Sequence, residues 1–265
     1  MALTIGCVGC GNMGGAIMAG LARTGGHSLC GYNRTSARMQ PLEALGVSAL
    51  QSPLAVAQAA DVLILGVKPY QAAEVLEQMR PGLTAEKTVV SVAAGVSCQR
   101  LSHAVDGRCP VVRCMPNTPA LVGKGVFALC CEDPAIPAAR KAEVLALFNA
   151  LGVCVELPEN KFTAFTALIG AGPAYVFAMM QGLVQAGVTL GFQHKESRDM
   201  VAALFGGCAT MVEQSTKPLM QLRDDVCSPG GVTIAGVNVL DREGLIGLLV
   251  DSVLAANARG KEMES

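Results

Sequence analysis

Residues 4–17 read TIGCVGCGNMGGAI, a short apolar stretch that leads directly into closely spaced glycines. Three of the glycines have the spacing G-x-G-x-x-G, between a predicted strand and a predicted helix. In that setting the first glycine makes a tight turn, the second leaves room for a pyrophosphate, and the third lets the helix pack on the strand. The helix N-terminus then faces the anion. The stretch predicts a dinucleotide-binding loop made of Gly9, Gly11, Asn12, Met13 and Gly14.

The first part of the chain alternates β-rich and helical stretches. The predicted strands cover residues 4–9, 28–32, 61–67, 87–93, 110–115, 127–131 and 153–157. Such alternation indicates a parallel sheet with helices on both faces, and strands that are apolar throughout fit that burial. After Leu157 the sequence becomes rich in Ala, Leu, Met and Gly. We therefore expect an α/β fold: residues 1–157 form a Rossmann-type doubly wound sheet, and residues 158–265 form an all-helical domain.

Composition limits the partners and the compartment. Twenty Lys and Arg against 21 Asp and Glu leave no basic excess, so nucleic acid is not an expected partner. The 11 cysteines lie in apolar runs, which is typical of free thiols in a reducing compartment. The N-terminus has no positive charge before its apolar run, which argues against a signal peptide. The sequence predicts a cytoplasmic protein.

A long uncharged stretch runs from Phe162 to Gln193. An apolar run of that length could span a bilayer. Gly170, Gly172 and Pro173 interrupt its start, and glutamines interrupt its later part. A helix that is apolar all round is also buried when a partner subunit covers it. We interpret the stretch as a buried or dimer-core helix and expect no membrane contact.

The cofactor is indicated by GYNRTSAR, residues 31–38, which contains no acidic residue. About 20 residues after the glycine loop, an Asp or Glu would bind the ribose 2′-hydroxyl of NAD. This chain instead has Asn33, Arg34 and Thr35. A guanidinium pairs with the 2′-phosphate of NADP, and the neighbouring polar side chains add hydrogen bonds. The sequence predicts NADPH as the preferred cofactor and NADH as a weaker one; the alternative is a surface arginine in a βα loop.

Further cofactor contacts are expected at the carboxyl ends of the other strands, where open α/β sheets bind ligands. The candidate residues are Val67, Lys68, Pro69, Ala94, Gly95 and Asn117. Prolines on both sides fix the chain around Asn117 and Thr118, so we expect these polar side chains to be presented near the nicotinamide. Lys68 is a candidate for binding phosphate or substrate; the alternative is a lysine that faces solvent.

Two stretches of the helical half present bare backbone, residues 170–175 (GAGPAY) and 228–233 (SPGGVT). In each, glycines precede a predicted helix, so free N–H groups would face a small anion such as a carboxylate. The alternative for either stretch is a plain turn between helices. No metal site is expected.

Taken together, these motifs resemble those of the pyrroline-5-carboxylate reductase family, which catalyses the last step of proline biosynthesis. The likeness covers almost the whole chain, in the order VGCGNMGGAI, GVKP, VAAGV, VRCMPNTPALVGKG, GAGPAYVF and CSPGGVTIAG. The last of these matches the signature region of the family.

The resemblance implies NADPH-dependent reduction of L-1-pyrroline-5-carboxylate to L-proline, with hydride transfer to the imine carbon. It implies a helical dimerisation domain that interlocks with a second subunit, and rings of such dimers up to a decamer. Thr233 matches the threonine beside the ring nitrogen, and Glu159 matches an acidic residue near the substrate or is a helix-start glutamate stabilised by the dipole. The implied substrate-binding residues are Glu159, Ala171, Gly172, Pro173, Gly230, Gly231, Val232 and Thr233.

The chain departs from the family pattern at several positions. Ile169 and Ala171 stand where serines are common, so carboxylate binding would depend on backbone amides. Val232 replaces a frequent threonine, and Pro53 replaces an asparagine near the adenosine ribose. Substrate range or cofactor affinity would differ accordingly.

Three alternative functions remain at this point. A β-hydroxyacid dehydrogenase has a similar domain order but uses a lysine for acid–base work, and GPAYVFAMMQGLVQAG, residues 172–187, has none. An imine reductase of different ring specificity fits the missing serines. A non-catalytic NADP-binding module is the third. For the reductase reading we expect Thr233 to orient the ring nitrogen while the proton comes from solvent or with the substrate.

Overall fold

The computed structural model describes residues 2–264 and divides into two compact units. The first comprises the chain up to Gly170 together with the last turns of the C-terminal helix, and the second is Ala171–Ala258. Each unit is described by itself.

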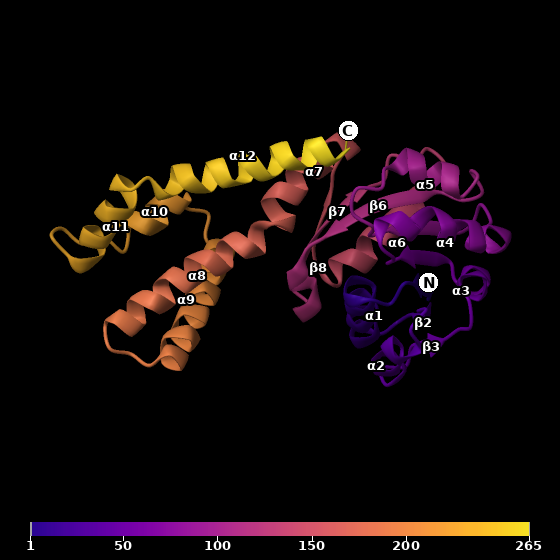
Figure 1. The fold of residues 1–265 in the computed structure, drawn as a ribbon, viewed down its shortest axis with the longest axis horizontal. Helices are drawn as coiled ribbons and strands as arrows, with labels where there is room; N and C mark the ends of the chain where they lie inside the picture. Colours follow the sequence, from indigo (N-terminus) through magenta and orange to yellow (C-terminus); the bar gives the residue numbers. More distant parts are fainter. Residues whose placement is uncertain (1, 265) are drawn as a thin grey trace. The chain divides into compact units, whose positions relative to one another are not determined.

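The first unit is built on an eight-stranded sheet in the order β3-β2-β1-β4-β5-β6-β7-β8 (Figure 1). The strands are β1 (Thr4–Val8), β2 (Ser28–Tyr32), β3 (Ser48–Ala49), β4 (Val62–Leu65), β5 (Thr88–Ser91), β6 (Val111–Pro116), β7 (Gly125–Cys130) and β8 (Gly152–Glu156). This confirms the Rossmann-type sheet. The short β3 was not predicted. Neither was the antiparallel β6–β7 pair, which arises because residues 117–124 are too few for the crossover that parallel strands need.

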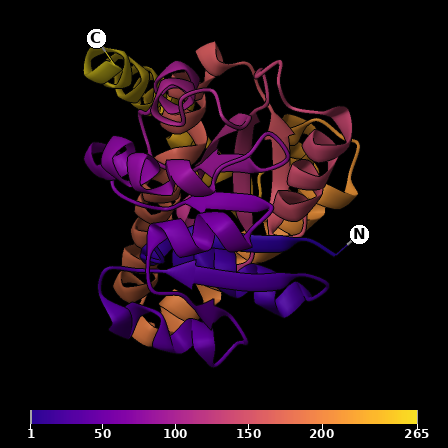
Figure 2. The same ribbon diagram turned by 90° about the vertical axis from the view of Figure 1, so that its right-hand side faces the viewer.

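Helices cover both faces of this sheet (Figure 2). One core contains side chains of α1 (Asn12–Thr24) and α6 (Ala138–Asn149), and the other contains side chains of α3 (Pro53–Ala59), α4 (Ala72–Met79) and α5 (Cys98–Ala104). Along β4, Val62 and Ile64 belong to the first core while Leu63 and Leu65 belong to the second. Successive strand residues point to opposite faces, so a sheet covered on both sides requires strands that are apolar throughout. A short helix, α2 (Gln40–Glu43), follows β2.

The C-terminal part of the chain is all helical, as predicted. It contains α7 (Phe162–Phe165), a π-helical turn at Thr166–Gly170, α8 (Gly172–Thr189), α9 (His194–Gln214), α10 (Leu219–Asp224), α11 (Val232–Arg242) and α12 (Leu245–Glu264). Within the second unit α8 packs against α9 (Figure 1). Gly187 permits that approach, because a Cβ there would lie 2.4 Å from the hydroxyl of Ser197.

The compact units divide after Gly170, whereas the sequence placed a boundary after Leu157. The segment between these positions belongs to the first unit because Phe162 and Phe165 are buried in a small core with Ala128 and Cys130 of β7. The helical stretch therefore begins on the sheet domain, and the second unit begins only with α8.

The second unit buries few of its own side chains. Among its described residues only Val184, Ser197 and Val201 are buried. The segment Glu159–Thr189 is long and apolar enough to cross a membrane by length and composition, yet only 17% of its most apolar window is buried. Large apolar side chains are exposed on every long helix of the unit, for example Phe177, Leu204, Leu240 and Leu248. This unit presents a surface of the kind that partner subunits cover.

Candidate dinucleotide and substrate sites

A cleft of about 760 Å³ lies at the carboxyl ends of β1, β2 and β4 in the first unit. Open α/β sheets bind ligands at this edge. Eleven predicted cofactor residues line the cleft: Gly9, Gly11, Asn12, Met13, Asn33, Arg34, Thr35, Val67, Lys68, Pro69 and Ala94. The fold thus brings together loops that are up to 85 residues apart, from Gly9 to Ala94.

The glycine loop has the geometry that a pyrophosphate site needs. Gly9 has φ of +93°, and its N–H donates to the carbonyl of Tyr32 at 2.9 Å. A Cβ at Gly14 would lie 2.4 Å from the Gly9 carbonyl oxygen, so this glycine packs α1 against the loop and does not line the cleft. A Cβ at Gly11 would meet nothing within 4 Å. The open space beside Gly11, at the N-terminus of α1, fits an anionic group.

The loop after β2 supplies the positive charge of the cleft. Arg34 and Thr35 are exposed and line it, and the Asn33 side-chain amide donates to the Thr35 carbonyl at 3.0 Å, which holds the turn. Arg34 makes no hydrogen bond or ion pair with any residue from 2 to 264. Its guanidinium is available to a 2′-phosphate, which fits an NADP site.

Arg38 is a cleft residue that the sequence analysis missed. It ends the 3₁₀ helix Ser36–Arg38, and its Nη1 donates to Asn12 Oδ1 at 3.3 Å. The available signal was its position four residues after Arg34, because residues three or four apart share a face of a helical turn. Two guanidinium groups thus line the end of the cleft that the absent acidic residue would have occupied.

The loops after β4 and β5 supply most, but not all, of the cleft residues predicted there. Val67, Lys68 and Pro69 line the cleft, and Lys68 is exposed. Ala94 lines it as well. Gly95 does not, although its φ of +74° explains why a glycine follows Ala94.

Asn117 differs from the expectation. It is buried and lies outside the cleft, its Oδ1 accepts from the N–H of Val126 at 2.9 Å, and its Nδ2 donates to the Ile169 carbonyl at 3.4 Å. The Ile169 carbonyl is free to accept because Pro173, four residues later, has no N–H. The amide of Asn117 therefore holds two backbone segments together, and its contact with the nicotinamide stays a prediction.

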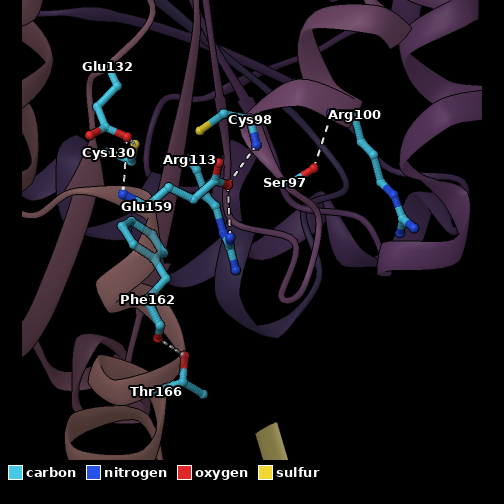
Figure 3. Close-up of polar contacts among 9 residues, drawn as sticks. All are labelled: Ser97, Cys98, Arg100, Arg113, Cys130, Glu132, Glu159, Phe162 and Thr166. Carbon is cyan, nitrogen blue, oxygen red and sulfur yellow. Dashed lines mark hydrogen bonds and ion pairs between the residues drawn. The ribbon is translucent and has the colours of Figure 1, made fainter. Parts of the chain in front are cut away.

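Glu159 also has partners that the sequence did not indicate (Figure 3). Its Oε1 accepts from the N–H of Cys98, at the start of α5, at 2.8 Å, and from Arg113 Nη1 at 2.9 Å. The Arg113 guanidinium lies 4.7 Å from the centre of the Phe162 ring. The carboxylate thus stabilises the N-terminus of another helix and a largely buried arginine. Glu159 is also the first residue of the 3₁₀ helix Glu159–Lys161, which agrees with the expected helix-start position.

The stretch Gly170–Pro173 leads into α8, with Ala171 as the N-cap residue and Pro173 in the first turn, as expected. It joins the π-helical turn Thr166–Gly170 directly to α8, and Ala171 has helical backbone angles, φ −84° and ψ −20°. Pro173 has no N–H and the Ala174 N–H donates to the Ala171 carbonyl at 2.9 Å, so part of this helix start is already used. Anion binding at this stretch stays a prediction. A π-helical turn is itself frequent at functional positions.

The stretch Ser228–Thr233 has the predicted form. Gly231 precedes α11 without a side-chain cap, and Gly230 has φ of +67°. Val232 and Thr233, the first residues of α11, are exposed. The N–H groups of this helix start are open to an anion.

Several cysteines away from the dinucleotide cleft have no thiolate chemistry to offer, whereas a hydrogen bond with Cys7 lowers the pKa of Cys10 in the glycine loop. Burial raises the pKa of Cys109 and of Cys131 to about 12, and that of Cys30 and of Cys154 to about 11. These thiols are protonated at neutral pH, and a thiol attacks only as the thiolate. The arrangement supports hydride chemistry at the dinucleotide cleft without a cysteine nucleophile.

A doubly wound sheet, a glycine loop at its switch edge and an arginine-lined end of the cleft define a dinucleotide-dependent oxidoreductase with an NADP-type site. Family models agree with this class. One described as "NADP oxidoreductase coenzyme F420-dependent" matches residues 4–95, and one described as "Pyrroline-5-carboxylate reductase dimerisation" matches residues 159–263.

Known proteins narrow the assignment. A pyrroline-5-carboxylate reductase of Glycine max is 35% identical, over 98% of this chain and 96% of that protein. A pyrroline-5-carboxylate reductase structure from Coxiella burnetii is similar with a TM-score of 0.93 and 30% identity over all of both chains. The Plasmodium falciparum pyrroline carboxylate reductase with NADP bound has a TM-score of 0.87 and 30% identity over 99% and 98% of the two chains. The chain belongs to the pyrroline-5-carboxylate reductase family.

Proposed function

We propose that this chain reduces L-1-pyrroline-5-carboxylate to L-proline with NADPH, as the last step of proline biosynthesis. The observation that carries the proposal is full-length family membership, together with a cleft that has the glycine loop and a cationic end in place of an acidic residue. NADPH supplies the hydride, which is added to the imine carbon while the ring nitrogen carries a proton from solvent. NADH is the weaker cofactor.

The cofactor is held by the residues that line the cleft. The N–H groups around Gly11 and Asn12 face the pyrophosphate, and Arg34 with Arg38 pairs with the 2′-phosphate. Lys68 lies on the same wall and adds positive charge near the phosphates. No residue of this set transfers a proton.

The substrate carboxylate is held by the backbone at the start of α11, where Val232 and Thr233 present N–H groups without a side-chain cap. Gly230 and Gly231 form the turn before them, and the Gly231 N–H donates to the Ser228 carbonyl at 3.0 Å. Ala171, Gly172 and Pro173 form the second part of the substrate site, at the π-helical junction. Thr233, exposed in the first turn of α11, is the proposed catalytic residue, because its hydroxyl orients the ring nitrogen. Catalysis then rests on positioning. Glu159 keeps a supporting role through Cys98 and Arg113.

The protein is a homo-oligomer in this proposal. The dimerisation match covers residues 159–263, where the second unit exposes its large apolar side chains. We infer a dimer with interlocked helical domains, in which the partner's loop completes the substrate site, and assembly of dimers into a decamer. The cytoplasm is the proposed location, since all 11 cysteines are free thiols and seven of them are buried.

The test is NADPH oxidation by the purified protein with pyrroline-5-carboxylate, repeated with NADH and with the six-membered piperideine-2-carboxylate. We expect turnover that favours the five-membered ring and NADPH. Activity on the six-membered ring alone would assign a different imine to the site, as Ile169 and Ala171 in place of serines would allow. Absence of turnover with every imine would leave only dinucleotide binding.

Thr233 is tested separately. Thr233→Ala should lower kcat/KM about 10- to 100-fold with no change in oligomeric state, because a hydrogen bond to a cationic nitrogen is lost in the transition state. Thr233→Ser keeps the hydroxyl and should retain most of the activity. Wild-type kinetics in the alanine variant would remove Thr233 from the mechanism.

A further inference from the structure

One face of α4 forms a wall of the dinucleotide cleft. Gln71, Glu74, Val75 and Gln78 line it, at the spacing i, i+3, i+4 and i+7 that places side chains on one side of a helix. Pro53, at the start of α3, lines the same cleft, and α3 packs against α4. Nothing in the site described above uses this wall.

The position of this wall identifies the part of the dinucleotide that it faces. The inference rests on the proposed cofactor site, in which Arg34 and Arg38 hold the 2′-phosphate and Gly11 faces the pyrophosphate. The adenine is attached to the same ribose as the 2′-phosphate, so it must lie beside these groups. Pro53 and Val75 offer apolar surface for the faces of a flat ring, and the polar side chains of α4 are left for its edge.

Glu74 is the unusual member of the wall. Its carboxylate is exposed and has no hydrogen-bond or ion-pair partner among residues 2–264. A carboxylate accepts hydrogen bonds and donates none, and its charge opposes a phosphate-rich ligand. It favours binding only where the ligand offers it a donor. The dinucleotide offers donors in its ribose hydroxyls and in the exocyclic 6-amino group, which is the donor on the edge of adenine. Because Glu74 lies on the α4 wall beside Val75 and Gln78, we assign it to the edge of the base.

We propose that Glu74 recognises the adenine of the cofactor by accepting a hydrogen bond from the 6-amino group. Gln78, one turn further along α4, supports this contact from the same face of the helix. Glu74 is therefore a specificity residue for the base, as Arg34 and Arg38 are for the 2′-phosphate. It plays no part in hydride transfer.

The test compares NADPH with its hypoxanthine analogue, in which an oxo group replaces the 6-amino group. Dissociation constants are measured by isothermal titration calorimetry on the wild-type protein, on Glu74→Gln and on Glu77→Gln. The wild-type protein should bind NADPH about 10-fold or more tightly than the analogue, because at position 6 a hydrogen bond to a charged group is exchanged for repulsion between two acceptors. The analogue also carries a hydrogen on N1, next to the oxo group, which restores only part of this loss. In Glu74→Gln the preference should fall below about 3-fold, since an amide can donate to the oxo group.

Glu77→Gln is the matched control. Glu77 lies on the same helix but lines a groove between α4 and α5, where it pairs with Arg80 at 3.8 Å. It should keep the wild-type preference. Equal binding of the two cofactors by the wild-type protein, or an unchanged preference in Glu74→Gln, would overturn the proposal. Because these are binding measurements, they stand apart from any failure of the protein to reduce an imine.

Discussion

The two compact units of this chain differ in what they enclose. The first buries apolar side chains on both faces of its sheet and contains a complete dinucleotide cleft. The second, Ala171–Ala258, buries only three of its described side chains and exposes leucines, valines, methionines and a phenylalanine on α8, α9, α11 and α12. The first unit has the core of an independent domain. The second has the surface of half an interface, and we expect its stability to depend on a second copy.

The largest expected effect is on assembly. Leu248 of α12 is 61% exposed in the isolated chain, and Leu248→Asp would place a charge on the surface that we expect a second copy to cover. A two-fold interface contains the substitution twice, at about 2 kcal/mol for each lost leucine. The dimer dissociation constant should then rise about 1000-fold or more. Analytical ultracentrifugation should show monomers. The activity assay should show little imine reduction, while NADPH binding persists.

Leu45→Asp is the control for that variant. Leu45 is 42% exposed and lies after α2, in the first unit. The same change there should leave the oligomer and the activity as in the wild-type protein. If Leu248→Asp remained a dimer at micromolar concentration, the expectation that a second copy covers this face of α12 would be wrong.

The second prediction separates packing from ligand binding inside the glycine loop. Gly14→Ala would place a Cβ 2.4 Å from the Gly9 carbonyl oxygen, and this backbone atom cannot move without displacing α1. We expect the free energy of unfolding of the first unit to fall by about 2–3 kcal/mol, with loss of NADPH binding. Urea denaturation followed by circular dichroism would measure the first effect, and calorimetry the second.

Gly11→Ala is its matched counterpart. Gly11 has open space around its Cβ position and φ of −78°, which any residue adopts. Stability should change by less than about 0.5 kcal/mol. The added methyl group lies where a pyrophosphate approaches, so NADPH affinity alone should fall. Equal loss of stability in both variants would show that the loop is held together differently from this account.

The sequence predicted the first unit better than the second for a physical reason. Strands such as Val62–Leu65 are apolar because both of their faces are buried within one chain. Their sequence pattern therefore predicts their position in the sheet. Gly9 and Gly14 are required by a close approach of backbone to backbone. Most apolar residues of α8 are exposed within one chain, so their pattern predicted a helix but not what covers it.

Polar side chains were predicted least well. Asn117 and Glu159 were assigned to ligands, because a sequence shows their chemistry but not their neighbours. The structure gives them partners 9 and 61 residues away, the N–H groups of Val126 and Cys98. Arg38 was missed because only the folded loop brings it to Asn12. The α4 wall of the cleft was missed because helical periodicity alone does not separate a ligand-facing side chain from a solvated one.

The third prediction concerns cofactor choice, which belongs to the first unit alone. Arg34→Ala should lower the ratio of kcat/KM for NADPH to that for NADH about 10- to 100-fold, because a charge-assisted bond to the 2′-phosphate is lost. Arg38→Ala should have a smaller effect, since Arg38 also binds Asn12. Arg100→Ala, in α5 outside the dinucleotide cleft, should leave the ratio unchanged. An unaltered ratio in Arg34→Ala would assign the 2′-phosphate to other groups.

The smallest expected effect concerns Glu159, which lies where the C-terminal helical stretch begins on the first unit. Glu159→Gln keeps an oxygen for the Cys98 N–H but removes the negative charge beside Arg113, a side chain only 9% exposed. The free energy of unfolding should fall by about 1–2 kcal/mol, because hydrogen bonds to charged groups are weakened in a partly buried site. Glu156→Gln, which breaks a more exposed pair with Lys141, should leave it almost unchanged. The KM for the imine separates the two roles of Glu159. A supporting carboxylate leaves KM within about twofold, whereas a tenfold rise at unchanged stability would place Glu159 at the substrate.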